Sequence, residues 1–327
     1  MNDGIPDRVP LFQEGIREEV LDAWHQQGLP AGTALATMFN YDKLEEIEPV
    51  LDPIPAIPRW SSKESIIEAL RRRLDPYDPS RLPPDWREQV RRWQGPQQTT
   101  LFLRVHSGFF LTMGVEGWHS FTEAIRLLKD NPAFVHEMMA VQAGFAASLT
   151  ERILGEVEVD GVIFHEPIAG SHGPLISPNM YADFVLNSYA PVLDVVERFN
   201  VKTIILRTYA NARALLPNVF RTRINTLWAC ECNSNAMDYR LLREEFGPRV
   251  RLIGGINVDV LRQSRDAIRK EVDDKVLPLL SQGRFVPLAD GRVREDVPFE
   301  NYAFYRRYLE IITQEKNEMH PGAQRTI

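Results

Sequence analysis

The feature that most constrains this 327-residue sequence is an alternation of short apolar runs with longer amphipathic stretches. The short runs are rich in β-branched and aromatic residues, which favour strands. Strands that alternate with helices predict a parallel sheet, because parallel neighbours need a crossover connection between them. The predicted strands cover residues 99–105, 159–164, 201–206, 224–229, 250–253 and 284–288, with 9–12 and 51–57 as weaker candidates.

About eight such units in one domain favour an α/β fold of the (β/α)8 TIM barrel type over a doubly wound open sheet. No GxGxxG or GxxxxGK[ST] motif follows the early strands, which counts against a nucleotide-binding open sheet. Ser177-Pro178 and Asn131-Pro132 have the pattern of a helix N-cap followed by proline, and Gly247 is placed to end a helix. We predict a single domain over residues 1–316 and a flexible tail over 317–327.

Residues 58–98 differ from the rest of the chain because they are rich in Arg, Pro and Trp. We predict a helical insertion in the N-terminal part of the barrel. Its arginines stand beside acidic residues, which is typical of a solvated helical face. The alternative is a lid over the barrel mouth, since insertions after barrel strands commonly form such lids.

Charge and composition exclude several classes of protein. The formal net charge of -7 argues against nucleic acid or an anionic membrane surface as the main partner. No apolar run approaches the roughly 20 residues that cross a bilayer. The first residues lack the pattern of a secretory signal, so we expect a cytoplasmic protein. Two cysteines exclude a disulfide scaffold and any four-cysteine metal site.

Polar and ionisable residues recur where successive predicted strands end. In a parallel barrel these ends meet on one face, where the active site lies. Every barrel has loops on this face, so the pattern supports a pocket more than any one reaction. The candidates, in chain order, are Arg104, His106, His165, Glu166, Arg207, Tyr209, Asn211, Cys230, Cys232, Asn257, Asp290 and Arg292.

His165 and Glu166 are the sharpest pair among these candidates. Neighbours on a strand point to opposite faces, so only one of the two can face the barrel axis while the strand continues. One interpretation is a general acid or base. The other is a glutamate that accepts backbone hydrogen bonds from the loop after the strand, and we weigh the two equally.

The arginines and cysteines each have two interpretations. Arg104, Arg207 and Arg292 could clamp a carboxylate, because guanidinium groups bind carboxylates through two hydrogen bonds. They could also form internal salt bridges to Glu166, Glu231 and Asp290, and the two roles are compatible. Cys230 and Cys232 could bind zinc together with His165. We favour the alternative of two partly buried thiols and expect no metal.

Five segments resemble successive blocks of the uroporphyrinogen decarboxylase superfamily. They read LRVHSGFFLTMGVEGW, GVIFHEPIAGSHGPLISPNMY, IILRTYANARALLP, RLIGGINVDVL and GRFVPLADGRVREDVPFENYAFY, in this order over residues 99–308. The superfamily also contains methyltransferases linked to corrinoids and coenzyme M. The resemblance implies a (β/α)8 barrel and a small carboxylated or tetrapyrrole-like substrate, and it allows a homodimer.

The sequence departs from both branches of this superfamily at key positions. The residues at the Tyr, Ser and His positions of the decarboxylases are Met113, Pro167 and Asp290, and the arginine-rich N-terminal motif is missing. The zinc motif of the methyltransferases, His-x-Cys-Gly-Asn, corresponds here to residues 207–211, which begin with Arg207. Arginine cannot ligate zinc because it stays protonated.

Three functions follow from these observations. The first is a metal-independent decarboxylase or other lyase, without cofactor and distinct from an authentic uroporphyrinogen decarboxylase. It would bind a carboxylated small molecule through Arg207, Tyr209 and Arg292, with Glu166 or Asp290 as acid or base. The second is a methyltransferase with a relocated zinc site and a corrinoid protein docked near residues 58–98. The third is a non-catalytic ligand-binding barrel.

Overall fold

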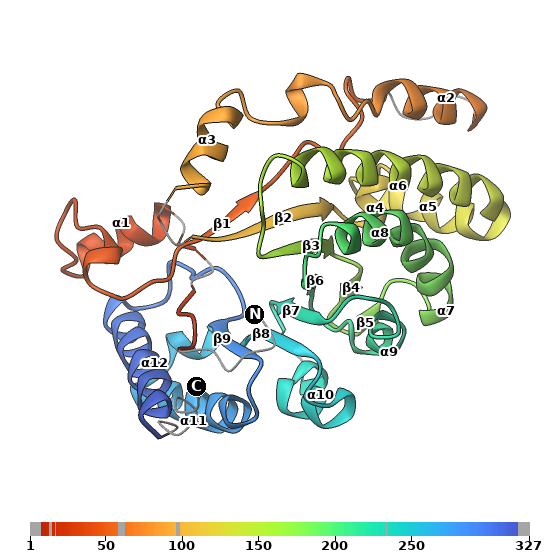
Figure 1. Cartoon of the computed structure of the whole chain (residues 1–327). Helices are drawn as coiled ribbons and strands as arrows, with labels where there is room; N and C mark the ends of the chain where they lie inside the picture. Colours follow the sequence, from red (N-terminus) through yellow and green to blue (C-terminus); the bar gives the residue numbers. More distant parts are fainter. Residues whose placement is uncertain are drawn as a thin grey trace, which may run out of the picture. The chain divides into compact units, whose positions relative to one another are not determined.

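A computed structural model describes residues 8–12, 15–16, 18–57, 63–95, 99–232 and 235–319 (Figure 1). The chain divides into two compact units. One unit is Leu44–Asn225, and the other combines Met1–Lys43 with Thr226–Ile327. We call them the central unit and the terminal unit and describe each by itself.

Among its described residues, the central unit contains four parallel strands that pair in the order β1, β2, β3 and β6. The strands are β1 (Leu44–Ile47), β2 (Thr100–His106), β3 (Gly161–Glu166) and β6 (Thr203–Tyr209). Two short strands, β4 (Ala169–Gly170) and β5 (Gly173–Pro174), form an antiparallel hairpin after β3.

The α6 helix contacts β2, and α6 and α8 pack against each other (Figure 1). Asn131 Oδ1 accepts a hydrogen bond from the Phe134 amide at the start of α6, and Pro132 is its first residue, as predicted. The helices of the unit are α2 (Lys63–Arg73), α3 (Trp86–Trp93), α4 (Phe109–Thr112), α5 (Trp118–Asp130), α6 (Pro132–Leu154), α7 (Pro178–Met180), α8 (Ala190–Arg198) and α9 (Leu216–Val219).

The described part of the terminal unit contains three parallel strands in the order β7, β8 and β9. They are β7 (Thr226–Cys230), β8 (Arg251–Ile256) and β9 (Phe285–Ala289). Its helices are α1 (Glu18–Gln26), α10 (Tyr239–Phe246), α11 (Arg265–Gln282) and α12 (Phe299–Met319). The α11 helix packs on β8, β9, α10 and α12. Gly247 ends α10 with a φ of 75°, as its position in the sequence predicts.

The structure confirms an α/β fold of parallel strands and helices, and this arrangement is consistent with a TIM-barrel-like fold. A closed eight-stranded barrel stays a prediction. Six predicted strands are present, whereas residues 9–12 and 51–57 form no strand, and β1 forms at Leu44–Ile47 instead. The consecutive glutamates of β1 break the apolar pattern that predicts the other strands. The prolines within residues 51–57 prevent a central strand there.

The predicted insertion at 58–98 contains α2 and α3, with residues 58–62 and 96–98 outside the described part. Of the predicted tail, residues 317–319 end α12, and 320–327 lie outside the described part. Among the described residues, no helix combines the length and apolar character that crossing a membrane requires.

Candidate functional site

Strand register in the central unit brings four predicted site residues to one face of the sheet. Arg104 pairs with Ile163, and two residues further along β3 His165 pairs with Arg207. Paired residues of parallel strands point to the same side, as do residues two apart on a strand. Arg104, His165, Arg207 and Tyr209 therefore share a face near the carboxyl ends of β2, β3 and β6.

Glu46 of β1 holds the two arginines of this face together. Its carboxylate accepts one hydrogen bond from Arg104 Nε at 2.9 Å and another from Arg207 Nη1 at 2.8 Å. These three side chains are only 12–22% exposed. Arg104 Nη2 also lies 2.5 Å from a carboxylate oxygen of Glu48, whose side chain is 54% exposed. We call Glu46, Arg104, His165, Arg207 and Tyr209 the arginine cluster.

His165 is the titratable imidazole of the arginine cluster. Its Nε2 lies 3.2 Å from the Tyr209 hydroxyl, and the two rings meet nearly edge to face. Burial, and then the positive charges of Arg104 and Arg207, lower the pKa of His165 to about 4. The ring is therefore neutral at pH 7.

Glu166 points to the opposite face, toward the helices. The register of β2 shifts between Arg104 and His106, so that His106 pairs with Phe164, which shares a face with Glu166. The fully buried Glu166 carboxylate accepts hydrogen bonds from the Phe109 amide at 2.9 Å and the Tyr189 hydroxyl at 2.6 Å. His106 Nε2 lies 3.1 Å from the same carboxylate.

Glu166 is thus a carboxylate that holds neighbouring groups in place, but its backbone donor is Phe109, which follows β2, and not the loop after β3 that the second interpretation named. Burial, together with the negative charge of Glu166, raises the pKa of Tyr189 well above its ordinary value, so this hydroxyl stays a donor. A catalytic role for Glu166 stays a prediction. The predicted pair thus divides: His165 belongs to the arginine cluster, and Glu166 belongs to a separate buried network with His106.

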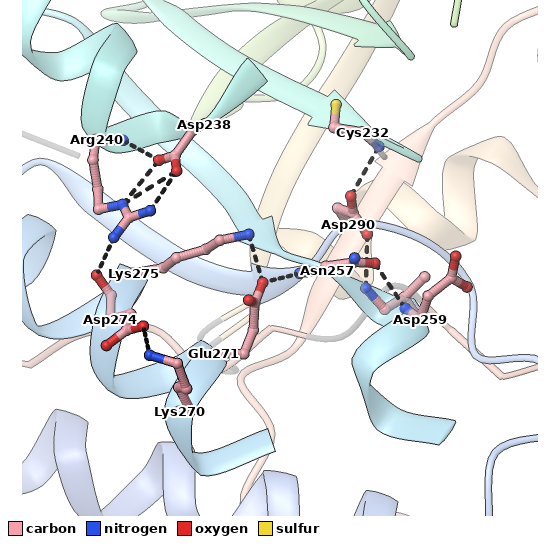
Figure 2. A network of polar contacts seen from close by, with 11 residues as sticks. Cys232, Asp238, Arg240, Asn257, Asp259, Lys270, Glu271, Asp274, Lys275 and Asp290 are labelled. Carbon is pink, nitrogen blue, oxygen red and sulfur yellow. Dashed lines mark hydrogen bonds and ion pairs between the residues drawn. The ribbon is translucent and has the colours of Figure 1, made fainter. Parts of the chain in front are cut away.

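A second polar network lies at the carboxyl ends of the strands in the terminal unit (Figure 2). The Asp290 carboxylate accepts hydrogen bonds from the Val258 amide at 2.9 Å and the Cys232 amide at 2.8 Å. Asp290 is only 2% exposed, and burial raises its pKa against the opposing effect of these two amides. Asp290 therefore fixes the chain that follows β7 and β8, and its predicted role as acid or base stays a prediction.

Asn257 and Lys275 belong to the same network. The Glu271 carboxylate accepts a hydrogen bond from the backbone amide of Asn257 at 2.9 Å. It also forms an ion pair with Lys275 Nζ at 2.6 Å (Figure 2). The Asn257 side chain accepts a hydrogen bond from the Asp259 amide at 2.9 Å. Asn257, Lys275 and Asp290 line a polar cavity of about 60 Å³, large enough for a few water molecules.

The two cysteines do not form the donor set that zinc requires. The strand β7 ends at Cys230, and Glu231 has a left-handed φ of 51°, so Cys230 and Cys232 do not share a strand face. The Cys232 thiol lies 3.4 Å from the Cys230 carbonyl oxygen, and burial raises its pKa well above the usual range. Within the described ranges, no group of three or more His, Cys, Asp or Glu side chains could hold a metal ion.

The two remaining predicted residues occupy loops. Asn211 is half-buried, and its side chain accepts a hydrogen bond from the Arg213 amide at 3.3 Å. Arg292 is exposed in the terminal unit. Sequence reasoning missed Glu46 and Lys275. Glu46 lies in a short polar strand, and its neighbours in the sequence give no sign of its contacts with Arg104 and Arg207. Lys275 lies in a long amphipathic helix, and nothing near it in the sequence indicates that it lines the polar cavity with Asn257 and Asp290.

A comparison with protein-family models matches residues 98–286 to uroporphyrinogen decarboxylase (URO-D). This match covers more than half of the chain. The chain belongs to the uroporphyrinogen decarboxylase family. The resemblance seen in the sequence is thereby confirmed. A search of curated proteins gave no match. Arg104, His165, Arg207 and Tyr209 lie within the matched URO-D region, whereas Glu46 precedes it and Asp290 and Arg292 follow it.

Proposed function

We propose that this member of the uroporphyrinogen decarboxylase family is a lyase that binds a carboxylated small molecule at the arginine cluster and removes a carboxyl group as CO2. The observation that carries the proposal is the placement of Arg104 and Arg207 on one face, joined by Glu46 and adjacent to a neutral His165. The proposed activity differs from that of an authentic uroporphyrinogen decarboxylase, because the sequence lacks most of the groups with which such enzymes handle a porphyrinogen.

The arginines are suited to anchor a substrate carboxylate. Glu46 fixes both guanidinium groups, so little side-chain freedom is lost when a ligand binds. The Glu48 carboxylate on Arg104 is more than half exposed, and an incoming substrate carboxylate can take its place. Burial lowers the pKa of His165 most, and Arg104 and Arg207 lower it further, against the opposing effect of Glu46.

The same groups supply what decarboxylation needs. The bond between the carboxyl carbon and its neighbour breaks, CO2 leaves, and the electron pair stays on the neighbouring carbon. The positive charge of Arg104 and Arg207 stabilises this developing anion. A proton then reaches the carbon from the Tyr209 and His165 pair, which solvent reprotonates. A bound carboxylate opposes the charge of the arginines and moves the pKa of His165 upward, so the ring becomes a better proton carrier in the complex.

The zinc chemistry of the methyltransferase branch does not fit these residues. The first position of its motif holds Arg207, which stays protonated, and Tyr209 takes the place of the cysteine. We therefore derive no step through a metal ion. A ligand that binds at the arginine cluster without releasing CO2 would instead favour the third function, a non-catalytic ligand-binding barrel.

A ligand panel tests the proposal, starting with carboxylated tetrapyrroles and small aromatic acids. Binding is measured by calorimetry, and CO2 release from carboxyl-labelled ligands by mass spectrometry. We expect Arg207→Gln to weaken binding of a hit at least about tenfold, because a charge-assisted bidentate contact is lost. Arg198→Gln is the matched control, since this exposed arginine of the same unit pairs with Glu151 away from the cluster. Equal effects of the two variants would contradict the proposal.

A further inference from the structure

A groove with a volume of about 340 Å³ lies on the terminal unit, between α11 and α12. Arg265 and Arg269 line it from α11, and Phe304, Arg307 and Tyr308 line it from α12. None of these residues belongs to the arginine cluster or to the Asp290 network. The proposed function therefore leaves this groove unexplained.

Aromatic rings lie close to the guanidinium groups of the groove. The rings of Phe304 and Tyr308 stack at an interplanar angle of 8°, with centroids 5.6 Å apart. The Arg269 guanidinium lies over both rings, 5.6 Å from Phe304 and 5.0 Å from Tyr308. The Tyr308 hydroxyl donates a hydrogen bond to Asp273 at 2.5 Å, and Arg307 lies 5.9 Å over Phe39. These ring contacts restrict Arg269 and Arg307 and leave their N–H groups available to a ligand.

The groove is cationic on a chain that is acidic as a whole. Its lining contains three arginines and one acidic residue, Glu300, whereas the net charge of the chain is -7. Glu300 pairs with Arg265 at 2.9 Å, but its side chain is 78% exposed, and such surface pairs open readily. In the part of the chain that the structure describes, neither Arg269 nor Arg307 forms an ion pair.

We propose that this α11/α12 groove docks an acidic peptide segment of a partner protein. Carboxylates of the segment would meet Arg269 and Arg307, and an apolar side chain would cover Ile311, which is 50% exposed. The lining runs along α12 from Glu300 to Ile311, a rise of roughly 16 Å at the usual pitch. That length matches about five residues of extended peptide, and the open shape suits a chain segment better than an enclosed small molecule.

The test uses the full-length protein and a fluorescent peptide of eight glutamates with one central leucine. We expect anisotropy to show binding that weakens steeply as salt rises, because the contacts are ionic and exposed. Arg269→Gln/Arg307→Gln should weaken binding at least about tenfold. Arg126→Gln/Arg198→Gln, which alters two exposed arginines of the central unit by the same charge, should bind as the unaltered protein does. Far-ultraviolet circular dichroism checks that both variants fold.

Glu300→Gln provides a gain-of-function arm. It removes the carboxylate that competes for Arg265 and should tighten peptide binding about two- to threefold. No binding by the unaltered protein at low salt would overturn the proposal. So would equal weakening in the control variant. Tighter binding of a single-stranded RNA of equal charge would also overturn it and point to nucleic acid as the occupant.

Discussion

At the residue scale, the adjacent His165 and Glu166 have opposite surroundings because a strand alternates its faces. The sequence rule predicts that the two side chains separate, but it does not predict which face each one takes. That assignment depends on the register shift in β2, which turns His106 toward Glu166 and leaves Arg104 beside His165. A shift of this kind arises from packing and leaves no mark in the local sequence.

The low pKa of His165 makes a prediction about stability. The ordinary pKa of 6.5 applies in the unfolded chain and a pKa of about 4 in the folded protein, so between these values the unfolded chain binds more protons. Folding is therefore favoured above pH 6.5, and this contribution is lost as the pH falls toward 4. The full difference amounts to about 3 kcal/mol.

Urea unfolding of the unaltered protein and of His165→Gln, at intervals from pH 7 to pH 4, measures this contribution. We expect the free energy of unfolding of the unaltered protein to fall by about 2–3 kcal/mol more than that of the variant over this range. Parallel curves for the two proteins would show that His165 has an ordinary pKa in the folded protein and would contradict this prediction.

At the element scale, strands with apolar residues were predictable and a strand held by charges was not. The six predicted strands are present because β-branched residues pack well on a pleated, buried sheet. The strand β1 reads Leu-Glu-Glu-Ile, and Glu46 is accommodated there through its contacts with Arg104 and Arg207. Such partners lie far away in sequence, so no local window detects them.

The junction of β7 and β8 depends on one tyrosine. The Tyr239 hydroxyl accepts a hydrogen bond from the Ala229 amide at 2.9 Å and donates one to the Ile253 carbonyl at 2.7 Å. The ladder between the strands ends at this point, with Ala229 opposite Gly254. Gly255 has a φ of 90°, and a Cβ there would lie 2.8 Å from the Tyr239 ring, so glycine is required for this packing.

Tyr239→Phe should therefore destabilise the protein by about 1–3 kcal/mol, because a buried amide and a buried carbonyl lose their partner. Thermal unfolding followed by circular dichroism gives the change. The control is Tyr77→Phe, since Tyr77 is 71% exposed and its hydroxyl has water available. A Tyr239→Phe protein as stable as the control would show that these two hydrogen bonds contribute nothing net.

At the scale of the whole molecule, the ordered blocks of sequence revealed the family, but the reaction depends on a few substituted positions. A family pattern is spread over many residues of a fold, so it can survive the loss of catalytic groups. The chemistry depends on which side chains meet, and Glu46, the residue that joins the two arginines, lies outside the matched region. The family was therefore predictable from the chain, and the arrangement of the site was not.

Elemental analysis of protein purified without chelators distinguishes the lyase from the methyltransferase. Zinc needs deprotonated thiolates, neutral imidazoles or carboxylates, whereas Arg207 stays charged and burial disfavours the Cys232 thiolate. We expect far less than one zinc per chain, with the same content in Cys232→Ala. About one zinc per chain, lost in Cys232→Ala, would contradict the lyase proposal. The metal would then lie beside Cys232, and the arginine cluster would bind a substrate whose chemistry takes place elsewhere.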